Sequence, residues 1–128
     1  MVASKVIMRV IKEKKEELLV SLMFICFLII LASCLVYYTE HNVQPEKFGN
    51  IPQTMWWAVC TLTTVGYGDM YPITALGKLL TGIIILLGIG MLALPTGILA
   101  SGFAEEFHKK KHKAHYCHNC GEKLHEEE

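Results

Sequence analysis

Two uncharged hydrophobic blocks dominate the pattern of the sequence, and a more polar segment separates them. The first block runs from Leu18 to Tyr38 and the second from Leu79 to Ala100. Each would form a helix of about 30 Å, which is the thickness of the hydrocarbon core of a bilayer. Each is hydrophobic all round, unlike the surface helix of a soluble protein. A cleaved signal peptide would be shorter and nearer the N-terminus. We therefore expect membrane-spanning helices at 18–38 and 79–104.

The connecting segment, 39–78, changes character at its middle. Residues 39–50 (TEHNVQPEKFGN) are polar and rich in turn formers, whereas 52–64 (PQTMWWAVCTLTT) are compact and largely hydrophobic. Pro52 suits the first turn of a helix, where its missing N–H is not needed. A helix of about a dozen residues is too short to cross a membrane, since each residue adds about 1.5 Å. We expect it to enter the membrane partway and return, with protein or a water-filled cavity covering its backbone.

The run TTVGYGD (63–69) follows this short helix and must lead the chain back out of the membrane. Carbonyl groups left without partners in hydrocarbon cost several kcal/mol each. A dehydrated cation can satisfy them if successive carbonyls face one axis, which requires left-handed dihedrals that Gly66 and Gly68 adopt without strain. Val65 and Tyr67 would then turn their side chains away from the axis, and the Thr64 hydroxyl would add an oxygen at the inner end.

Charge placement predicts the orientation of the chain, although the formal net charge is +0 and gives no indication of nucleic-acid binding. Basic residues precede the first block and follow the second, and the connecting segment holds only Lys47 and Lys78. The flanking basic residues are Lys5, Arg9, Lys12, Lys14, Lys15, Lys109, Lys110, Lys111 and Lys113. By the positive-inside rule both termini are cytoplasmic, and 39–78 is external.

The stretches WWAVCTLTTVGYGDMYP and LGKLLTGIIILLGIGMLALP resemble the pore domain of voltage-gated-type potassium channels, of a prokaryotic-like kind, and TVGYG is the sequence of the potassium filter. The resemblance implies an all-α membrane protein in the plasma membrane, with two transmembrane helices, a re-entrant pore helix and a selectivity-filter loop. It also implies a homotetramer in the lipid bilayer. The potassium ions would be held by Thr64, Val65, Gly66, Tyr67 and Gly68.

The same resemblance assigns roles to residues around the filter. Trp56 would donate a hydrogen bond to Asp69 behind the filter, Trp57 would pack near Tyr67, and Cys60 stands where relatives often carry an acid or valine. Tyr71 would form the ring at the outer mouth that binds external tetraethylammonium. An interfacial aromatic belt is the alternative interpretation of the two tryptophans.

In the second membrane helix, Gly88 matches the family's hinge glycine, and Pro95 with Gly97 matches a Pro-X-Pro bend that has lost its second proline. Gating by bending of this helix is therefore expected. Close helix packing is the alternative, because small residues recur at Ala93, Gly97 and Ser101. Glu105 and Glu106 would form a charge ring or, as the preferred interpretation, a solvated acidic turn at the start of the tail, 105–128.

The N-terminal stretch, 1–17, has hydrophobic residues on one helical face and is expected to lie at the inner membrane interface. Six-helix relatives use a similar segment to link a voltage sensor to the pore. The chain has no arginine-bearing membrane helix that would sense voltage. We therefore expect a pore module whose voltage-sensor or regulatory domain lies outside this chain, with a native two-helix channel as the alternative.

The tail contains a C-x-x-C pair, Cys117 and Cys120, with His112 and His115 nearby. This spacing can present two thiolates to one Zn²⁺ ion, and neighbouring subunits would supply missing ligands. A basic and acidic tail with incidental cysteines is the alternative, because the chain has no second C-x-x-C. A cytosolic location disfavours a disulfide.

The whole sequence thus predicts a potassium-selective pore and not an enzyme, since no nucleophile–base pair or phosphate-binding loop is visible. Two other functions fit the sequence less well. A nonselective cation pore conflicts with the intact TVGYG run. A membrane-anchored metal-binding adaptor would have no use for a re-entrant helix followed by paired glycines.

Overall fold

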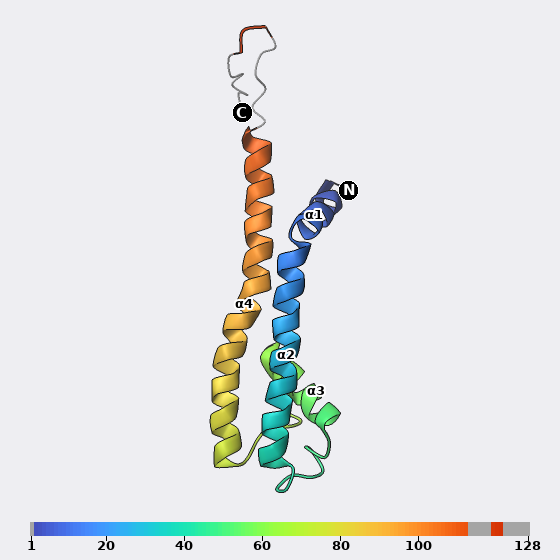
Figure 1. The fold of residues 1–128 in the computed structure, drawn as a ribbon, viewed down its shortest axis with the longest axis vertical. Coiled ribbons are helices and arrows are strands. Elements are labelled where there is room, and N and C mark those ends of the chain that lie inside the picture. Colours follow the sequence, from blue (N-terminus) through green and yellow to red (C-terminus); the bar gives the residue numbers. More distant parts are fainter. Residues whose placement is uncertain (1, 113–118, 122–128) are drawn as a thin grey trace. The chain divides into compact units, whose positions relative to one another are not determined.

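The computed structural model describes residues 2–112 and 119–121, and the regular elements of these residues are all helices (Figure 1). They are α1 (Val2–Glu13), α2 (Lys15–Glu40), α3 (Ile51–Leu62) and α4 (Ala75–His112). The all-α prediction is therefore confirmed. The chain divides into two compact units, one made of Met1–Lys15 with Gly97–Glu128 and the other of Glu16–Thr96, and each is described by itself.

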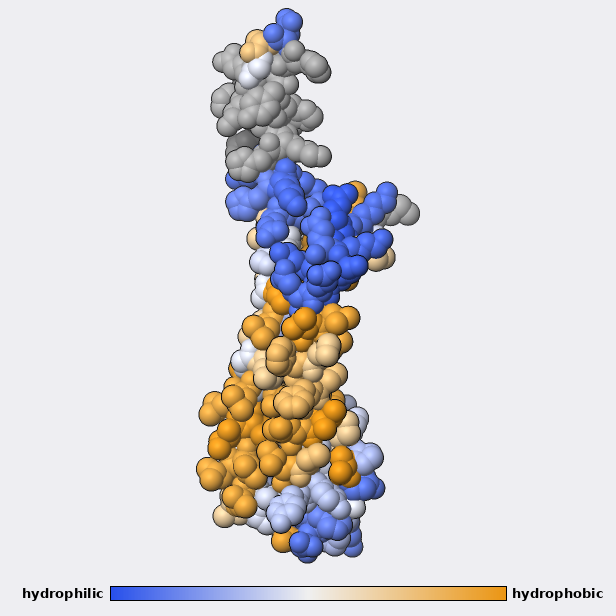
Figure 2. Space-filling model, viewed as in Figure 1, coloured by the Kyte–Doolittle hydropathy of each residue, from blue (hydrophilic) through white to orange (hydrophobic). Residues whose placement is uncertain are grey.

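Two helices are long and hydrophobic enough to span a membrane, as the sequence predicted: Lys15–Glu40 and Ala75–Lys111. Only 28% and 11% of their most hydrophobic windows are buried within the chain. Figure 2 shows the hydrophobic surface that these helices expose. An exposed apolar surface of this extent needs lipid or further protein against it.

The larger unit, Glu16–Thr96, has one hydrophobic core, to which α2, α3, α4 and the loop between α2 and α3 all contribute. The short α3 lies beside α2, and the loop after α3 leads to α4 (Figure 1). The core residues are Leu28, Ala32, Val36, Phe48, Trp57, Ala58, Leu62 and Ile84. Because three helices and the loop between α2 and α3 meet here, the core holds the short helix in place between α2 and α4.

The carboxyl group of Glu40, at the end of α2, connects three parts of this unit and is fully buried. Its oxygens accept hydrogen bonds from the side-chain amide of Gln44 (2.8 Å) and from the backbone N–H groups of Ile73 (3.1 Å) and Thr74 (3.0 Å). The Thr74 hydroxyl also donates to Glu40 at 2.5 Å. Buried carboxyl groups need such partners, so Glu40 ties the outer end of α2 to the start of α4.

Thr74 caps the N-terminus of α4 while it bonds Glu40. Its hydroxyl oxygen accepts a hydrogen bond from the Gly77 N–H at 2.9 Å, the third residue of the helix. Threonine commonly caps a helix in this way, by accepting a hydrogen bond from a backbone N–H group that has no partner within the helix. Gly77 is buried, and a Cβ there would collide with Glu40 Oε1 and lie 2.6 Å from Thr74 Oγ1. The absence of a side chain at residue 77 therefore permits the contact between the two helix ends.

In the smaller unit, α1 packs against the last turns of α4. Val10 is 1% exposed, and a Cβ on Gly102 would approach its Cγ1 to 2.6 Å. Around this contact lie ion pairs between the two helices and between α4 and Lys14, the residue that follows α1. They are Arg9–Glu106 at 2.8 Å, Lys14–Glu105 at 3.8 Å and Lys109–Glu13 at 3.9 Å.

These contacts correct the interpretation of residues 105 and 106 as a solvated acidic turn. Both lie inside α4, which continues to His112 instead of ending near 104. The side chain of Glu106 is 7% exposed and pairs with Arg9. The sequence misled here because the change from hydrophobic to charged residues marks the end of a membrane span, not the end of a helix.

We predict that Gly77→Ala lowers the free energy of unfolding of the chain in detergent by about 1–3 kcal/mol, because the new methyl group must displace Glu40 or Thr74. Thermal unfolding followed by circular dichroism measures the loss. The matched control is Gly82→Ala, since a Cβ at Gly82 of the same helix has no heavy atom within 4 Å. Alanine should stabilise α4 at residue 82. Equal unfolding midpoints for both variants would contradict the prediction.

Candidate functional site

The short helix α3 has well-defined ends, which set where the TTVGYGD segment begins. The side chain of Asn50 accepts a hydrogen bond from the Gln53 N–H at 2.8 Å, and Pro52 occupies the first turn, as the sequence predicted. At the other end, Thr63 is the C-cap and its N–H bonds the carbonyl of Val59 at 3.0 Å. The chain leaves helical geometry immediately afterwards.

Backbone dihedrals in the TTVGYGD segment alternate in sign. Gly66 and Gly68 have φ of 55° and 77°, the positive values that the sequence predicted. Thr64 has φ of 61° and is the one non-glycine residue with positive φ in the described part of the chain. A β-branched residue rarely adopts this conformation, and such strain concentrates at functional sites.

The inner end of the segment is attached to α3 by two backbone hydrogen bonds. The N–H groups of Val65 and Gly66 both donate to the carbonyl of Cys60, each at 3.0 Å. Cys60 itself is buried in α3. The predicted filter therefore starts from a backbone that the short helix holds in place.

Trp56 holds the outer end of the segment through two contacts. Its indole Nε1 donates a hydrogen bond to Asp69 Oδ2 at 3.2 Å, which confirms the predicted pairing. Its ring stacks on that of Tyr67, with centroids 5.8 Å apart and an angle of 12° between the planes. Stacked aromatic pairs contribute about 0.5–1.5 kcal/mol beyond the area they bury.

Trp57 differs from its predicted place. It was expected near Tyr67, but it is 4% exposed and packs edge-on against Phe48, with ring centroids 6.1 Å apart. Adjacent residues of a helix point about 100° apart, and within this chain it is Trp56 whose ring stacks on Tyr67. Trp57 instead packs α3 against the loop between α2 and α3.

Tyr71 lies two residues after the segment and is joined to the loop between α2 and α3. Its carbonyl oxygen accepts a hydrogen bond from the Gln44 side-chain amide at 3.1 Å. Its ring is 55% exposed, and the ammonium group of Lys47 lies 5.3 Å from the ring centroid. Sequence reasoning did not identify Gln44, Lys47 or Glu40 as neighbours of this end of the segment. Their separation along the chain gave no signal of the contact.

The predicted hinge residues all lie within the uninterrupted helix α4, including Pro95. A Cβ on Gly88 would collide with Leu62 Cδ2 of α3, so this glycine allows close packing against the short helix. At Gly97 a Cβ would meet no heavy atom within 4 Å. Packing thus has direct structural support at Gly88, and bending stays a prediction.

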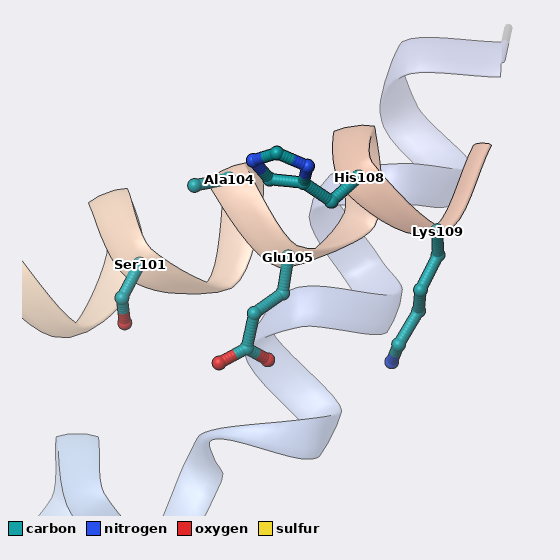
Figure 3. A pocket seen from close by; sticks show the side chains of 5 residues that line it. All are labelled: Ser101, Ala104, Glu105, His108 and Lys109. Carbon is teal, nitrogen blue, oxygen red and sulfur yellow. The ribbon is translucent and has the colours of Figure 1, made fainter. Parts of the chain in front are cut away.

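A shallow pocket lies on the last turns of α4, lined by Ser101, Ala104, Glu105, His108 and Lys109 (Figure 3). All five residues belong to one helix, and Glu105 already pairs with Lys14. Glu105 and Lys109 point to the same side of the helix, whereas His108 points to the other. The pocket therefore does not converge on one ligand.

The predicted zinc ligands fall largely outside the described residues, to which Cys117 and His115 do not belong. His112 is the last residue of α4, and Cys120 is an exposed free cysteine. Across 2–112 and 119–121, no group of three or more histidine, cysteine or acidic side chains is placed to hold a metal ion. Zinc binding by the tail stays a prediction from the sequence.

The chain is similar in sequence to known ion channels. A family model described as an ion channel matches residues 24–105. The chain is 54% identical over 74 residues, 58% of its length, to a cyclic nucleotide-gated potassium channel of Rhizobium etli. It is 37% identical over 108 residues to the voltage-gated potassium channel regulatory subunit KCNG3 of Rattus norvegicus, and 35% identical over 118 residues to potassium voltage-gated channel subfamily A member 6 of Homo sapiens. The two mammalian matches cover 81% and 89% of the chain.

The matched regions are short parts of these relatives. They cover 21%, 25% and 22% of the bacterial, rat and human proteins, respectively. The chain therefore corresponds to about a quarter or less of each relative's length.

Proposed function

Since this chain belongs to the ion channel family, and its relatives include potassium channels of bacteria and mammals, we propose that it forms a potassium-selective pore in the plasma membrane. Four copies surround one axis, and the backbone oxygens of residues 64–68, with the Thr64 hydroxyl, replace the water around K⁺. Both termini are cytoplasmic.

The alternating sign of φ along residues 64–68 is the observation that carries this proposal. Positive values at Thr64, Gly66 and Gly68 alternate with Val65 and Tyr67, which do not have positive φ. Such alternation turns successive peptide units so that their carbonyls point to one side, whereas a regular β-strand directs them alternately. A row of oxygens on one side of the chain is what a dehydrated cation requires.

Supporting contacts keep this row rigid. The Trp56–Asp69 hydrogen bond and the Trp56–Tyr67 stack brace its outer end, and the two bonds to the Cys60 carbonyl brace its inner end. In a filter that selects by cavity size, oxygens held at a fixed spacing fit K⁺ better than the smaller Na⁺, so these contacts favour a selective pore over a nonselective one.

Gating is proposed to involve the inner helix α4, with Gly88, Pro95 and Gly97 as the positions of bending. Proline in a helix removes one backbone hydrogen bond and thereby lowers the cost of bending. The helix α1, at the inner membrane interface, contacts the end of α4 through Val10 and Arg9. A voltage-sensor or regulatory domain outside this chain would act through these contacts.

The first prediction is that the chain in planar bilayers conducts K⁺ in strong preference to Na⁺. The reversal potential under opposed K⁺ and Na⁺ solutions measures this preference. A value near zero would refute selectivity. Gly66→Ala should abolish potassium-selective current, because φ of 55° opposes a Cβ even though the space beside Gly66 is open. Gly82→Ala is the control for an added methyl group, and an unchanged current in Gly66→Ala would contradict the role of the glycine.

A second prediction concerns Tyr71, whose exposed ring is proposed to face external quaternary ammonium ions. Tyr71→Val should raise the half-blocking concentration of external tetraethylammonium about tenfold or more, since four rings would each lose about 0.5–1 kcal/mol of attraction. Single-channel conductance should change little. Tyr71→Phe, which keeps the ring, is the control. Equal block in the valine and phenylalanine variants would mean that the ring does not face the mouth.

A third prediction is that the tail binds Zn²⁺ through Cys117 and Cys120, with His112, His115 or neighbouring subunits supplying the remaining ligands. Elemental analysis of protein purified without chelator should detect zinc, and a Cys117→Ser/Cys120→Ser double variant should lose it. Absence of zinc from the parent, or equal zinc in both, would refute the site. Chelation that leaves open probability unchanged would refute only a role in gating.

A further inference from the structure

Lys47 of the external loop lies against the ring of Tyr71 within the same chain. Its ammonium nitrogen is 5.3 Å from the ring centroid, within the distance of about 6 Å at which a cation is attracted to an aromatic face. Both residues are exposed within the chain. The ring proposed to receive external cations is therefore already in contact with a cation of the protein itself.

The backbone on both sides of this contact is anchored. Phe48, next to Lys47, is fully buried and packs on Trp57, and the Lys47 N–H bonds the Gln44 carbonyl at 3.1 Å. Gln44 in turn donates from its side-chain amide to Glu40 and to the Tyr71 carbonyl. Gln44 thus joins the loop that carries Lys47 directly to the backbone of Tyr71. The lysine is held near the ring by the fold and not only by its own flexible side chain.

We infer that Lys47 is a specificity-determining residue of the external cation site, because its ammonium group engages the Tyr71 ring and weakens the binding of organic cations there. The inference rests on the proposed pore function. The electrostatic attraction of a ring for a second cation falls when an ammonium group already polarises it. In addition, two positive charges close together in a site next to water repel each other.

The two effects have different signatures. Repulsion through solution acts between any two external charges and weakens as salt screens it, whereas competition for the ring requires the ring itself. An interaction between Lys47 and Tyr71 should therefore appear as non-additivity in a double-mutant cycle. Lys78, in the first turn of α4, provides a control, because it is the other lysine between residues 39 and 78.

The experiment measures the half-blocking concentration of external tetraethylammonium for the whole chain in bilayers carrying potassium current. Lys47→Met should lower it by about threefold or more, while Lys47→Arg, which keeps a cation beside the ring, should change it by less than about twofold. Lys78→Met should have a smaller effect than Lys47→Met. In a Tyr71→Val background, the effect of Lys47→Met should fall to that of Lys78→Met.

Two outcomes would overturn this inference without affecting the proposed function. The first is that Lys47→Met does not lower the half-blocking concentration. The second is that Lys47→Met changes it by the same factor in the parent chain and in Tyr71→Val. The second outcome would mean that the lysine acts only through solution. Lys47→Gln is a second charge-removing variant, used if the methionine variant does not assemble, and the same expectations apply to it. A parent chain without potassium-selective current would instead refute the proposed function, and this inference with it.

Discussion

A backbone that is neither helix nor sheet must have partners for its carbonyl groups when it lies within a membrane, and this constraint governs the architecture of the chain. Residues 63–69 leave helical geometry directly after α3, between two helices that are long and hydrophobic enough to span a bilayer. Neighbouring protein can cover part of such a segment. In the proposed pore, potassium ions would satisfy the oxygens that face away from it, and ion binding would then contribute to the stability of the segment.

Rigid support of this segment comes from the hydrophobic core and from hydrogen bonds at both ends. At one end, the N–H groups of Val65 and Gly66 bond the Cys60 carbonyl. At the other end, Trp56 donates a hydrogen bond to Asp69. Beyond the segment, the buried carboxyl group of Glu40 collects hydrogen bonds from the start of α4 and from Gln44. A buried carboxyl group with several donors is costly to disturb, so the outer ends of α2 and α4 are fixed relative to each other.

The smaller unit, formed by α1 and the last turns of α4, uses a different mixture of forces. Val10 fits against Gly102, and oppositely charged pairs surround this contact. Exposed ion pairs contribute little, but Glu106 is almost buried and would be left without compensation if Arg9 moved away. The contact at Gly102 thus sets the distance between the helices, and the charges set their register.

The sequence by itself determined the all-α class, the two spans, the short helix with Pro52 in its first turn and the left-handed glycines at 66 and 68. These features follow from local chemistry: the length of an apolar run, a proline without a donor, and residues without a Cβ. It also indicated the Trp56–Asp69 pairing, through resemblance to potassium channels. Only the tertiary structure decided that Trp57 packs on Phe48, that α4 continues to His112, that Thr64 takes a positive φ, and that Glu40, Gln44 and Lys47 meet the loop before α4. The contacts of Trp57 and of Glu40, Gln44 and Lys47 depend on segments that are far apart in the sequence, and the local pattern of residues does not indicate them. The last turns of α4 pack against α1, and Thr64 lies next to residues whose N–H groups bond the Cys60 carbonyl.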